Sequence, residues 1–275
     1  HGFELELHYN DKIGSDFRYH VGFTLASSEN RVVFRDDPVN GPNHLKEAGK
    51  PIGHQNRYLA VGNYETIDDV FNNAQTGSIN SVAPGQVVPG DFIYIDFDSN
   101  GILNGQDKVA VDELNYPLHT YGLNLGFDWK GLSFSAMFYA PTGVYKLVNS
   151  VYSASFKSGK INAQPDVMNA WTPETANTSG VRAPALHLTN DGAFNGTEST
   201  YRYQNFSYLR LKTMELGYNL PKKWLKTVGL KSLQVYVTGN NLLTWWGGDD
   251  RIDPEGEQAK YPILRSFTSG VRVSF

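Results

Sequence analysis

The residues of this chain that are best suited to chemistry lie in one stretch of twelve, from 96 to 107. Oxygen-bearing side chains stand at its positions 1, 3, 5, 9 and 12, and a glycine stands at position 6, which is the pattern of a calcium-binding loop. The expected ligands, including the backbone carbonyl of residue 102, are Asp96, Asp98, Asn100, Ile102, Asn104 and Asp107. We expect this loop to bind Ca²⁺, or Mg²⁺, as a structural ion.

A second interpretation of this loop stays open. Its last position holds Asp107, where the calcium pattern has glutamate, and the shorter side chain reaches less well for a bidentate contact. Asp, Asn and Gly are also common in turns that bind no metal. The alternative to a metal site is therefore an ordinary turn rich in Asp and Asn.

A second group of candidate residues combines aromatic rings with carboxylates. Trp245 and Trp246 precede Asp249 and Asp250 in a stretch that we expect to be a loop. Such rings can stack on sugars while the carboxylates bond to hydroxyl groups, so these four are candidate ligand-binding residues. The favoured alternative is that the rings anchor the chain at a membrane–water interface, where tryptophan is enriched.

Composition and motifs exclude several other classes of protein. The chain has no Cys, which removes disulfide scaffolds and thiolate metal sites. Its formal charge of −4 provides no basic surface for nucleic acid. The motifs of metalloproteases, serine hydrolases, P-loop proteins and dinucleotide-binding proteins do not occur, so we expect no catalytic residue and no enzyme. No apolar run of about 18 residues is present to form a transmembrane helix.

Apolar residues alternate with polar ones along seven stretches, which is the period of a β-strand with two different faces. We expect strands at residues 3–9, 17–25, 121–129, 132–138, 206–218, 233–238 and 267–275. The connections between them alternate between short and long. The long connections are residues 26–118, 141–205 and 242–264. In an up-and-down meander, all three would emerge at the same end of the sheet.

The position of all the long connections at one end of the sheet favours a transmembrane barrel over a soluble β-sandwich. Outer-membrane barrels have short turns at the periplasmic end and long loops at the extracellular end. The last strand carries Val271, Val273 and Phe275 on one face, and an aromatic residue at its end resembles an outer-membrane insertion signal. Seven strands cannot close a barrel alone, so we expect an N-terminal part of the protein to supply the others.

Several short motifs resemble one family in their order and spacing. They are Pro89-Gly90-Asp91-Phe92-Ile93-Tyr94-Ile95-Asp96, Tyr121-Gly122-Leu123, Tyr208-Leu209-Arg210-Leu211-Lys212, Leu216-Gly217-Tyr218-Asn219-Leu220-Pro221, Tyr236-Val237-Thr238-Gly239-Asn240-Asn241-Leu242, Asp253-Pro254-Glu255, Tyr261-Pro262 and the strand that ends at Phe275. Each motif is weak alone. Together they resemble the C-terminal region of SusC/RagA-type, TonB-linked outer-membrane proteins of Bacteroidetes.

This resemblance implies an all-β fold, a transmembrane antiparallel β-barrel of 22 strands of which this chain is the last seven. It also implies an N-terminal plug outside this segment, energy from TonB–ExbB–ExbD, and a SusD-like surface lipoprotein as partner. The expected function is import of oligosaccharides (glycans) or peptides across the cell outer membrane, in contact with its lipid. The alternative from a different class is a secreted carbohydrate-binding β-sandwich.

Overall fold

The computed structural model describes residues 1–72, 87–111, 113–148, 165–176, 183–186, 195–225, 229–258 and 260–275. The chain divides into two compact units that are both discontinuous in sequence. The first unit contains residues 1–30, 115–145 and 205–275, and the second contains residues 31–114 and 146–204. Among the described residues, no helix is long and apolar enough to cross a membrane.

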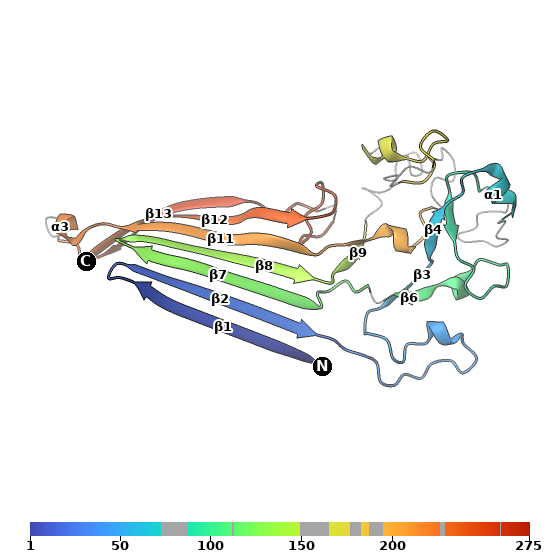
Figure 1. Ribbon diagram of the computed structural model, residues 1–275, viewed down its shortest axis with the longest axis horizontal. Helices are drawn as coiled ribbons and strands as arrows, with labels where there is room; N and C mark the ends of the chain where they lie inside the picture. Colours follow the sequence, from blue (N-terminus) through green and yellow to red (C-terminus); the bar gives the residue numbers. More distant parts are fainter. Residues whose placement is uncertain are drawn as a thin grey trace. The chain divides into compact units, whose positions relative to one another are not determined.

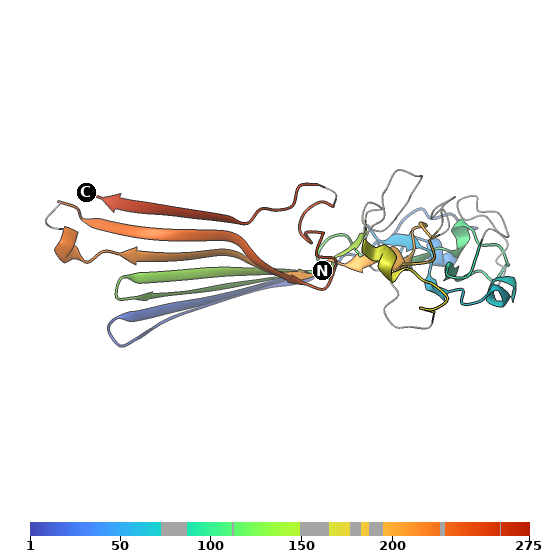
Figure 2. The same cartoon turned by 90° about the horizontal axis from the view of Figure 1, so that it is seen from above.

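The first unit is a single seven-stranded sheet in which every neighbouring pair is antiparallel. The strands run side by side in the order β1, β2, β7, β8, β11, β12, β13 (Figures 1 and 2). Their bounds are Gly2–Ile13, Phe17–Ser28, His119–Trp129, Leu132–Thr142, Tyr208–Asn219, Ser232–Trp246 and Ser266–Ser274. The seven strands predicted from alternation are therefore confirmed.

The register of this sheet sorts its side chains into an apolar face and a polar face. On the apolar face, Val21 lies opposite Leu125, and Leu125 lies opposite Ala136. On the polar face, the neighbouring row pairs His20 with Gly126, and Gly126 with Ser135. Because side chains alternate along every strand, these two rows lie on opposite faces of the sheet.

The apolar face is exposed along much of its extent. Large apolar side chains on it keep between 41% and 70% of their surface accessible, as in Leu5, Leu7, Leu216, Val237 and Phe267. An exposed apolar area of this extent is unusual for a monomeric soluble protein. The sheet therefore has one polar face and one apolar face, and the apolar face needs an apolar environment.

A β-bulge interrupts the alternation in the middle of β11 and β12. The register shifts between Leu211 and Thr213, and the partner strand carries Asn241 in the left-handed region, at φ 52°. The bulge explains why the alternation of β12 stops at this point in the sequence. Our prediction that a loop begins at residue 242 is wrong, because β12 resumes its pairing and continues through Trp246. The last long connection is residues 247–265.

Short connections join the strands at the end of the sheet opposite the long connections. Lys130 and Gly131 form a two-residue hairpin turn in which both have positive φ, at 47° and 92°, as a type I′ turn requires. The amide nitrogen of Asn219 donates to the carbonyl oxygen of Gly131 at 2.7 Å, so the end of β11 holds this turn. Between β11 and β12 lies the short helix α3, Lys222–Leu225.

The second unit is formed by the two longest connections, which contain short elements of their own. Strand β3 pairs with β6, β4 with β5, and β9 with β10. These strands are Gln55–Arg57, Val109–Val111, Ala60–Asn63, Phe92–Tyr94, Tyr145–Leu147 and Tyr203–Asn205. Helix α1 is Ile67–Asn72, and 3₁₀ turns occupy Asn43–Leu45, Gly105–Asp107, Pro165–Asn169 and Thr200–Arg202. Its apolar core is Tyr58, Phe92, Tyr94 and Leu103.

A glycine with positive φ fixes the start of β5 in this unit. Gly90 has φ 94°, and a Cβ atom there would come within 2.4 Å of the Trp171 ring. The next residue, Asp91, is buried, and its Oδ1 accepts a hydrogen bond from the side chain of Asn195 at 2.7 Å. The start of the Pro89–Asp96 motif is thus a packing element in which the turn needs glycine for two separate reasons.

We predict that Gly90→Ala destabilises the protein by about 3 kcal/mol, because it adds a steric clash of about 1–3 kcal/mol to the strain of a left-handed backbone. Gly49→Ala is the matched control, since Gly49 has φ 85° but open space around its Cβ position. Gly49→Ala should lower the free energy of unfolding only by the backbone strain, about 1 kcal/mol. Thermal unfolding of the full-length protein measures both, and equal losses would contradict the packing role of Gly90.

Candidate functional site

The twelve-residue loop predicted to bind metal lies in the second unit, between β5 and β6. Asp96, Asp98 and Asp107 each offer a carboxylate oxygen, and these three oxygens lie within 4.8 Å of one another. Two backbone positions in the loop have positive φ, Ser99 at 57° and Gly101 at 79°. The chain therefore makes the sharp turn where the calcium pattern requires glycine. The tertiary structure brings together three of the predicted ligands.

Backbone amides point at the first carboxylate of this loop. The amide nitrogen of Gly101 donates to Asp96 Oδ2 at 2.6 Å, and that of Asn100 donates to Asp96 Oδ1 at 3.2 Å. Burial alone would raise the pKa of Asp96, but these hydrogen bonds outweigh it and lower the pKa. Asp96 is therefore a charged carboxylate at neutral pH.

The shorter residue at the last position of the loop is buried at its base. Asp107 is fully buried, and its two oxygens accept from the amide nitrogens of Phe97 at 2.9 Å and Asn104 at 2.6 Å. The Ile102 carbonyl accepts from the Asn104 side chain at 3.1 Å. Neighbouring Leu103 inserts into the apolar core of the unit, which fixes the loop against it. Asn100 and Asp98 stay exposed on the outer side.

The four candidate ligand residues near the end of β12 do not form one group. Trp245 lies opposite Leu209 on the apolar face and is about half exposed, at 48%. The ring of Trp246 packs against Phe206, with centroids 5.1 Å apart. Asp249 accepts from Arg251 Nε at 2.9 Å, and Asp250 is exposed. This arrangement favours interfacial anchoring for Trp245 over a sugar-stacking platform.

The residues of the predicted insertion signal lie along the last strand. Val271 of β13 lies opposite Val235, and Val273 lies opposite Leu233. Both valines are exposed, and Phe275 follows the strand with 79% of its surface accessible. The structure places these side chains without testing membrane insertion, which stays a prediction.

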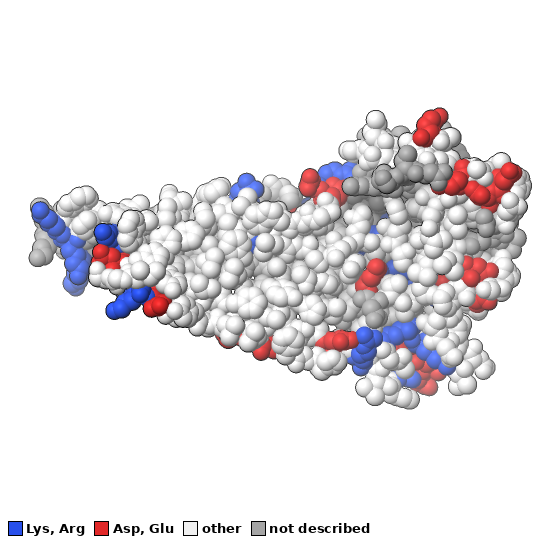
Figure 3. Space-filling model, in the orientation of Figure 1, with Lys and Arg blue, Asp and Glu red and all other residues white. Residues whose placement is uncertain are grey.

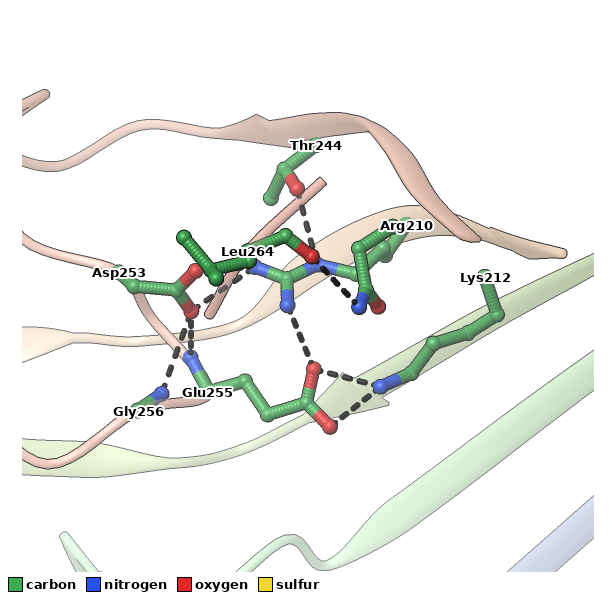
Figure 4. Close-up of polar contacts among 8 residues, drawn as sticks. Arg210, Lys212, Thr244, Asp253, Glu255, Gly256 and Leu264 are labelled. Atoms are coloured by element: carbon green, nitrogen blue, oxygen red, sulfur yellow. Dashed lines mark hydrogen bonds and ion pairs between the residues drawn. The ribbon is translucent and has the colours of Figure 1, made fainter. Parts of the chain in front are cut away.

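A buried ion-pair cluster escaped our sequence analysis, although it joins two of the motifs named above. Arg210 is only 2% exposed and lies on the polar face of β11 (Figure 4). Its Nη2 donates to Asp253 Oδ1 at 2.8 Å and its Nη1 to Glu255 Oε2 at 2.7 Å. Its Nε donates to Thr244 Oγ1 at 2.8 Å. Lys212 Nζ completes the cluster by donating to Glu255 Oε2 at 2.6 Å.

This cluster holds the 247–265 connection against the sheet. The two carboxylates of the cluster, Asp253 and Glu255, come from that connection, while the cations come from β11. A further bond runs from the Asn241 side chain at the bulge to the Leu264 carbonyl, at 3.2 Å. The available sequence signal was the opposite charge of the two motifs, but nothing in their spacing of more than 40 residues indicated contact.

A second polar network spans four strands of the same face. Arg272 Nη1 on β13 donates to Glu215 Oε1 on β11 at 2.9 Å and to Gln234 Oε1 on β12 at 2.8 Å. Gln234 in turn donates to Ser133 on β8 at 3.2 Å, and Thr238 donates to Glu215 at 2.8 Å. Such connected polar side chains suit a face that borders water.

Together, the seven strands form an antiparallel sheet with one exposed apolar face and one polar face, which is the side-chain pattern of outer-membrane barrel strands. No family model matches the chain. Its whole length is 26% identical to TonB-dependent receptor P3 of Formosa agariphila and 23% identical to TonB-dependent receptor SusC of Bacteroides thetaiotaomicron. The chain is thus a homologue of TonB-dependent receptors, which confirms the resemblance seen in its motifs. It spans 28% and 26% of the lengths of these relatives.

Solved structures show the same fold. The RagAB peptide importer in its open-open state matches the whole chain with a TM-score of 0.73 at 21% identity, over 28% of its own chain. A structure of the RagAB peptide transporter matches with a TM-score of 0.68 at 19% identity, over 29% of its own chain. The relatives and neighbours are named as receptors and transporters, not as enzymes.

Proposed function

We propose that this chain forms the C-terminal part of the barrel wall of an outer-membrane, TonB-dependent nutrient importer. The observation that supports this most directly is the register of the seven-stranded sheet, which gives every strand one apolar and one polar side. The apolar side faces the hydrocarbon of the membrane and the polar side faces the lumen. A secreted β-sandwich would cover its apolar face with a second sheet, whereas Leu7 and Val237 are at least half exposed.

The distance between two aromatic rows fits the thickness of a membrane. Trp129 and Tyr218 mark one end of the apolar face, and Trp245, opposite Leu209, marks the other. From Leu209 to Tyr218 the strand rises roughly 30 Å at about 3.3 Å per residue. With a tilt of about 40°, the rows are separated by roughly 23 Å, close to the apolar band of about 25 Å in outer-membrane barrels.

The two edges of the sheet support a larger barrel. Strand β1 pairs only with β2, and β13 only with β12, among the described residues. Unpaired edges are not tolerated in lipid, since no water is present to bond their amides and carbonyls. We propose that the remainder of a receptor-length chain supplies the pairing strands and the plug, in keeping with the 28% of the Formosa receptor that this chain spans.

The cargo and partners follow from the relatives as proposals. The cargo is a peptide or an oligosaccharide, the partner at the extracellular mouth is a SusD-like lipoprotein, and TonB–ExbB–ExbD supplies energy. Deletion of the full-length gene should abolish growth on the cargo, and the protein should stay in the outer-membrane fraction until detergent is added. Recovery of the full-length protein in a soluble fraction would contradict the proposal. Turnover of peptides or glycans by the purified protein would contradict it as well.

We also propose that the loop from 96 to 107 binds Ca²⁺ and thereby stiffens the second unit. Three carboxylates with oxygens within 4.8 Å of one another, a glycine turn and a buried anchor at Leu103 support this proposal. A hard cation prefers six to eight oxygen ligands, which this loop can supply together with water. The ion would neutralise the mutual repulsion of the three carboxylates.

We predict that Asp98→Asn weakens calcium binding at least about tenfold, because an exposed ligand loses its charge while the fold around buried Asp107 is kept. Asp68→Asn on helix α1 is the control, since Asp68 is exposed in the same unit. Calorimetric titration of chelator-treated, full-length protein with CaCl₂ and MgCl₂ measures the effect. Absence of saturable binding at millimolar calcium would contradict the site.

A further inference from the structure

Two tight connections at the same end of the seven-stranded sheet each place tryptophan beside lysine. Trp129 precedes Lys130 in the hairpin turn between β7 and β8, and helix α3 carries Lys222, Lys223 and Trp224. We call these five residues the basic rim. The Asn219–Gly131 backbone bond described above ties the two connections together. In Figure 1, helix α3 and the C-terminus lie at this end of the sheet.

The side chains of the basic rim are exposed although the backbone that carries them is fixed. Trp129 and Trp224 keep 49% and 63% of their surface accessible, and the Lys130 side chain keeps 63%. Lys222 and Lys223 are exposed as well. On the inner side of α3, Leu225 is buried, and its carbonyl accepts from the amide of Leu230 at 3.2 Å. The helix that carries Lys222, Lys223 and Trp224 is thus anchored through Leu225.

The basic rim directly continues the apolar face. Trp129 lies opposite Phe17 and Leu132, and Tyr218 lies opposite Leu132 and Val235, so this is the last apolar row of β2, β7, β8 and β11 before the turns. On the face seen in Figure 3, charged atoms are sparse over the middle of the sheet, and Lys and Arg atoms lie beside some Asp and Glu atoms at the end that holds α3.

The balance of charge at this end is positive. The connections at this end, with their flanking residues, contain six basic and three acidic residues. They are residues 10–18, 128–132 and the described part of 219–233. One of the acids, Asp16, lies 3.9 Å from Lys130 Nζ. The same ammonium group lies 5.8 Å from the centroid of the Trp129 ring, so it stands just beyond the aromatic row.

We propose that the basic rim binds the phosphate groups of anionic phospholipids. This inference rests on the proposed membrane location of the sheet. Tryptophan rings prefer the boundary between hydrocarbon and headgroups, and lysine chains extend from there to reach charged groups. Short connections of outer-membrane barrels face the periplasm, so the lipids are those of the inner leaflet. Each lysine near an anionic surface strengthens binding about fivefold.

The test uses the full-length protein with an equimolar mixture of phosphatidylglycerol and phosphatidylcholine in detergent, and counts bound lipids by native mass spectrometry. The unchanged protein should retain phosphatidylglycerol preferentially. Lys222→Gln combined with Lys223→Gln should reduce that preference about fivefold per lysine. Lys46→Gln combined with Lys260→Gln removes the same charge elsewhere and should leave it unchanged. Trp224→Ala should weaken the binding of both phosphatidylglycerol and phosphatidylcholine.

Several results would overturn the inference. If the unchanged protein retains both lipids equally, or if the control pair lowers the preference as much as the rim pair, the basic rim is not the binding surface. Reconstitution into phosphatidylcholine vesicles separates this failure from a failure of the proposed function. If the protein inserts into vesicles but shows no lipid preference, only the proposed lipid binding by the basic rim is contradicted. If the protein inserts into no bilayer, the proposed membrane location is contradicted, and the lipid binding with it.

Discussion

Replacing Arg210 with methionine should release the 247–265 connection from the sheet. The guanidinium is buried and bonds Asp253, Glu255 and Thr244, so its loss leaves two partly buried carboxylates with Lys212 as the remaining cation of the cluster. Removing one partner of a buried ion pair costs about 3–5 kcal/mol. Hydrogen exchange of the peptide covering residues 250–258 should accelerate at least about hundredfold, by the equivalence of about 1.4 kcal/mol to a factor of ten.

A matched control lies in the same connection. Arg251 is paired with Asp249, but this pair is more exposed, with side-chain accessibilities of 29% and 23%. Exposed pairs contribute only about 0–1 kcal/mol, so Arg251→Met should change exchange by less than about fivefold. Equal acceleration in both variants would mean that Arg210 is not the anchor of the connection.

Removal of the partner charges should rescue the Arg210 variant in part. Buried ion pairs are costly chiefly when one member stays behind alone, so adding Asp253→Asn and Glu255→Gln to Arg210→Met should recover part of the lost protection. Arg210→Lys should behave almost like the methionine variant, because an ammonium group cannot reproduce the fork that bonds three partners. No recovery in the triple variant would show that shape, and not charge, holds the connection.

Replacing Leu125 with arginine should remove the protein from the outer membrane. Leu125 lies in the middle row of the apolar face, opposite Val21 and Ala136. Arginine on the lipid side of a barrel at mid-depth costs about 2–4 kcal/mol. The neighbouring residue, Asn124, points to the other face and lies opposite Gly22 and Met137. Asn124→Arg should therefore leave the abundance of the protein nearly unchanged.

Abundance in isolated outer membranes measures both variants, with heat-dependent mobility on gels as the test of folding. The two substitutions are adjacent and add the same side chain, so the difference between them isolates the face of the sheet. If Asn124→Arg is lost from the membrane while Leu125→Arg persists, the faces are assigned the wrong way round. If both are tolerated equally, the sheet does not border lipid at all.

The local order of this chain could be predicted well because strand faces depend on a period of two residues. All seven predicted strands occur, since alternation such as Phe17, Tyr19 and Val21 reports directly which side chains share a face. The twelve-residue loop was likewise visible as spacing, and the structure gathers Asp96, Asp98 and Asp107 as that spacing requires.

The bulge could not be read from alternation, because it resets the phase. Asn241 adopts φ 52°, and the register of β12 shifts there, so Trp245 lies in a strand where the sequence indicated a loop. The extra residue changes the phase of β11, so that Leu211 and Met214 share the apolar face although they are three residues apart, whereas β12 keeps its phase from Val237 to Trp245.

The sequence by itself determined which residues alternate, where the tight turns fall and which loop has the spacing for a cation. These features depend on neighbours a few residues apart. Only the tertiary structure decided that Arg210 bonds Asp253 and Glu255, which are 43 and 45 residues away, and that Gly90 packs under Trp171. The physical reason is that such contacts depend on strand register and on how connections fold back, which sequence spacing does not encode.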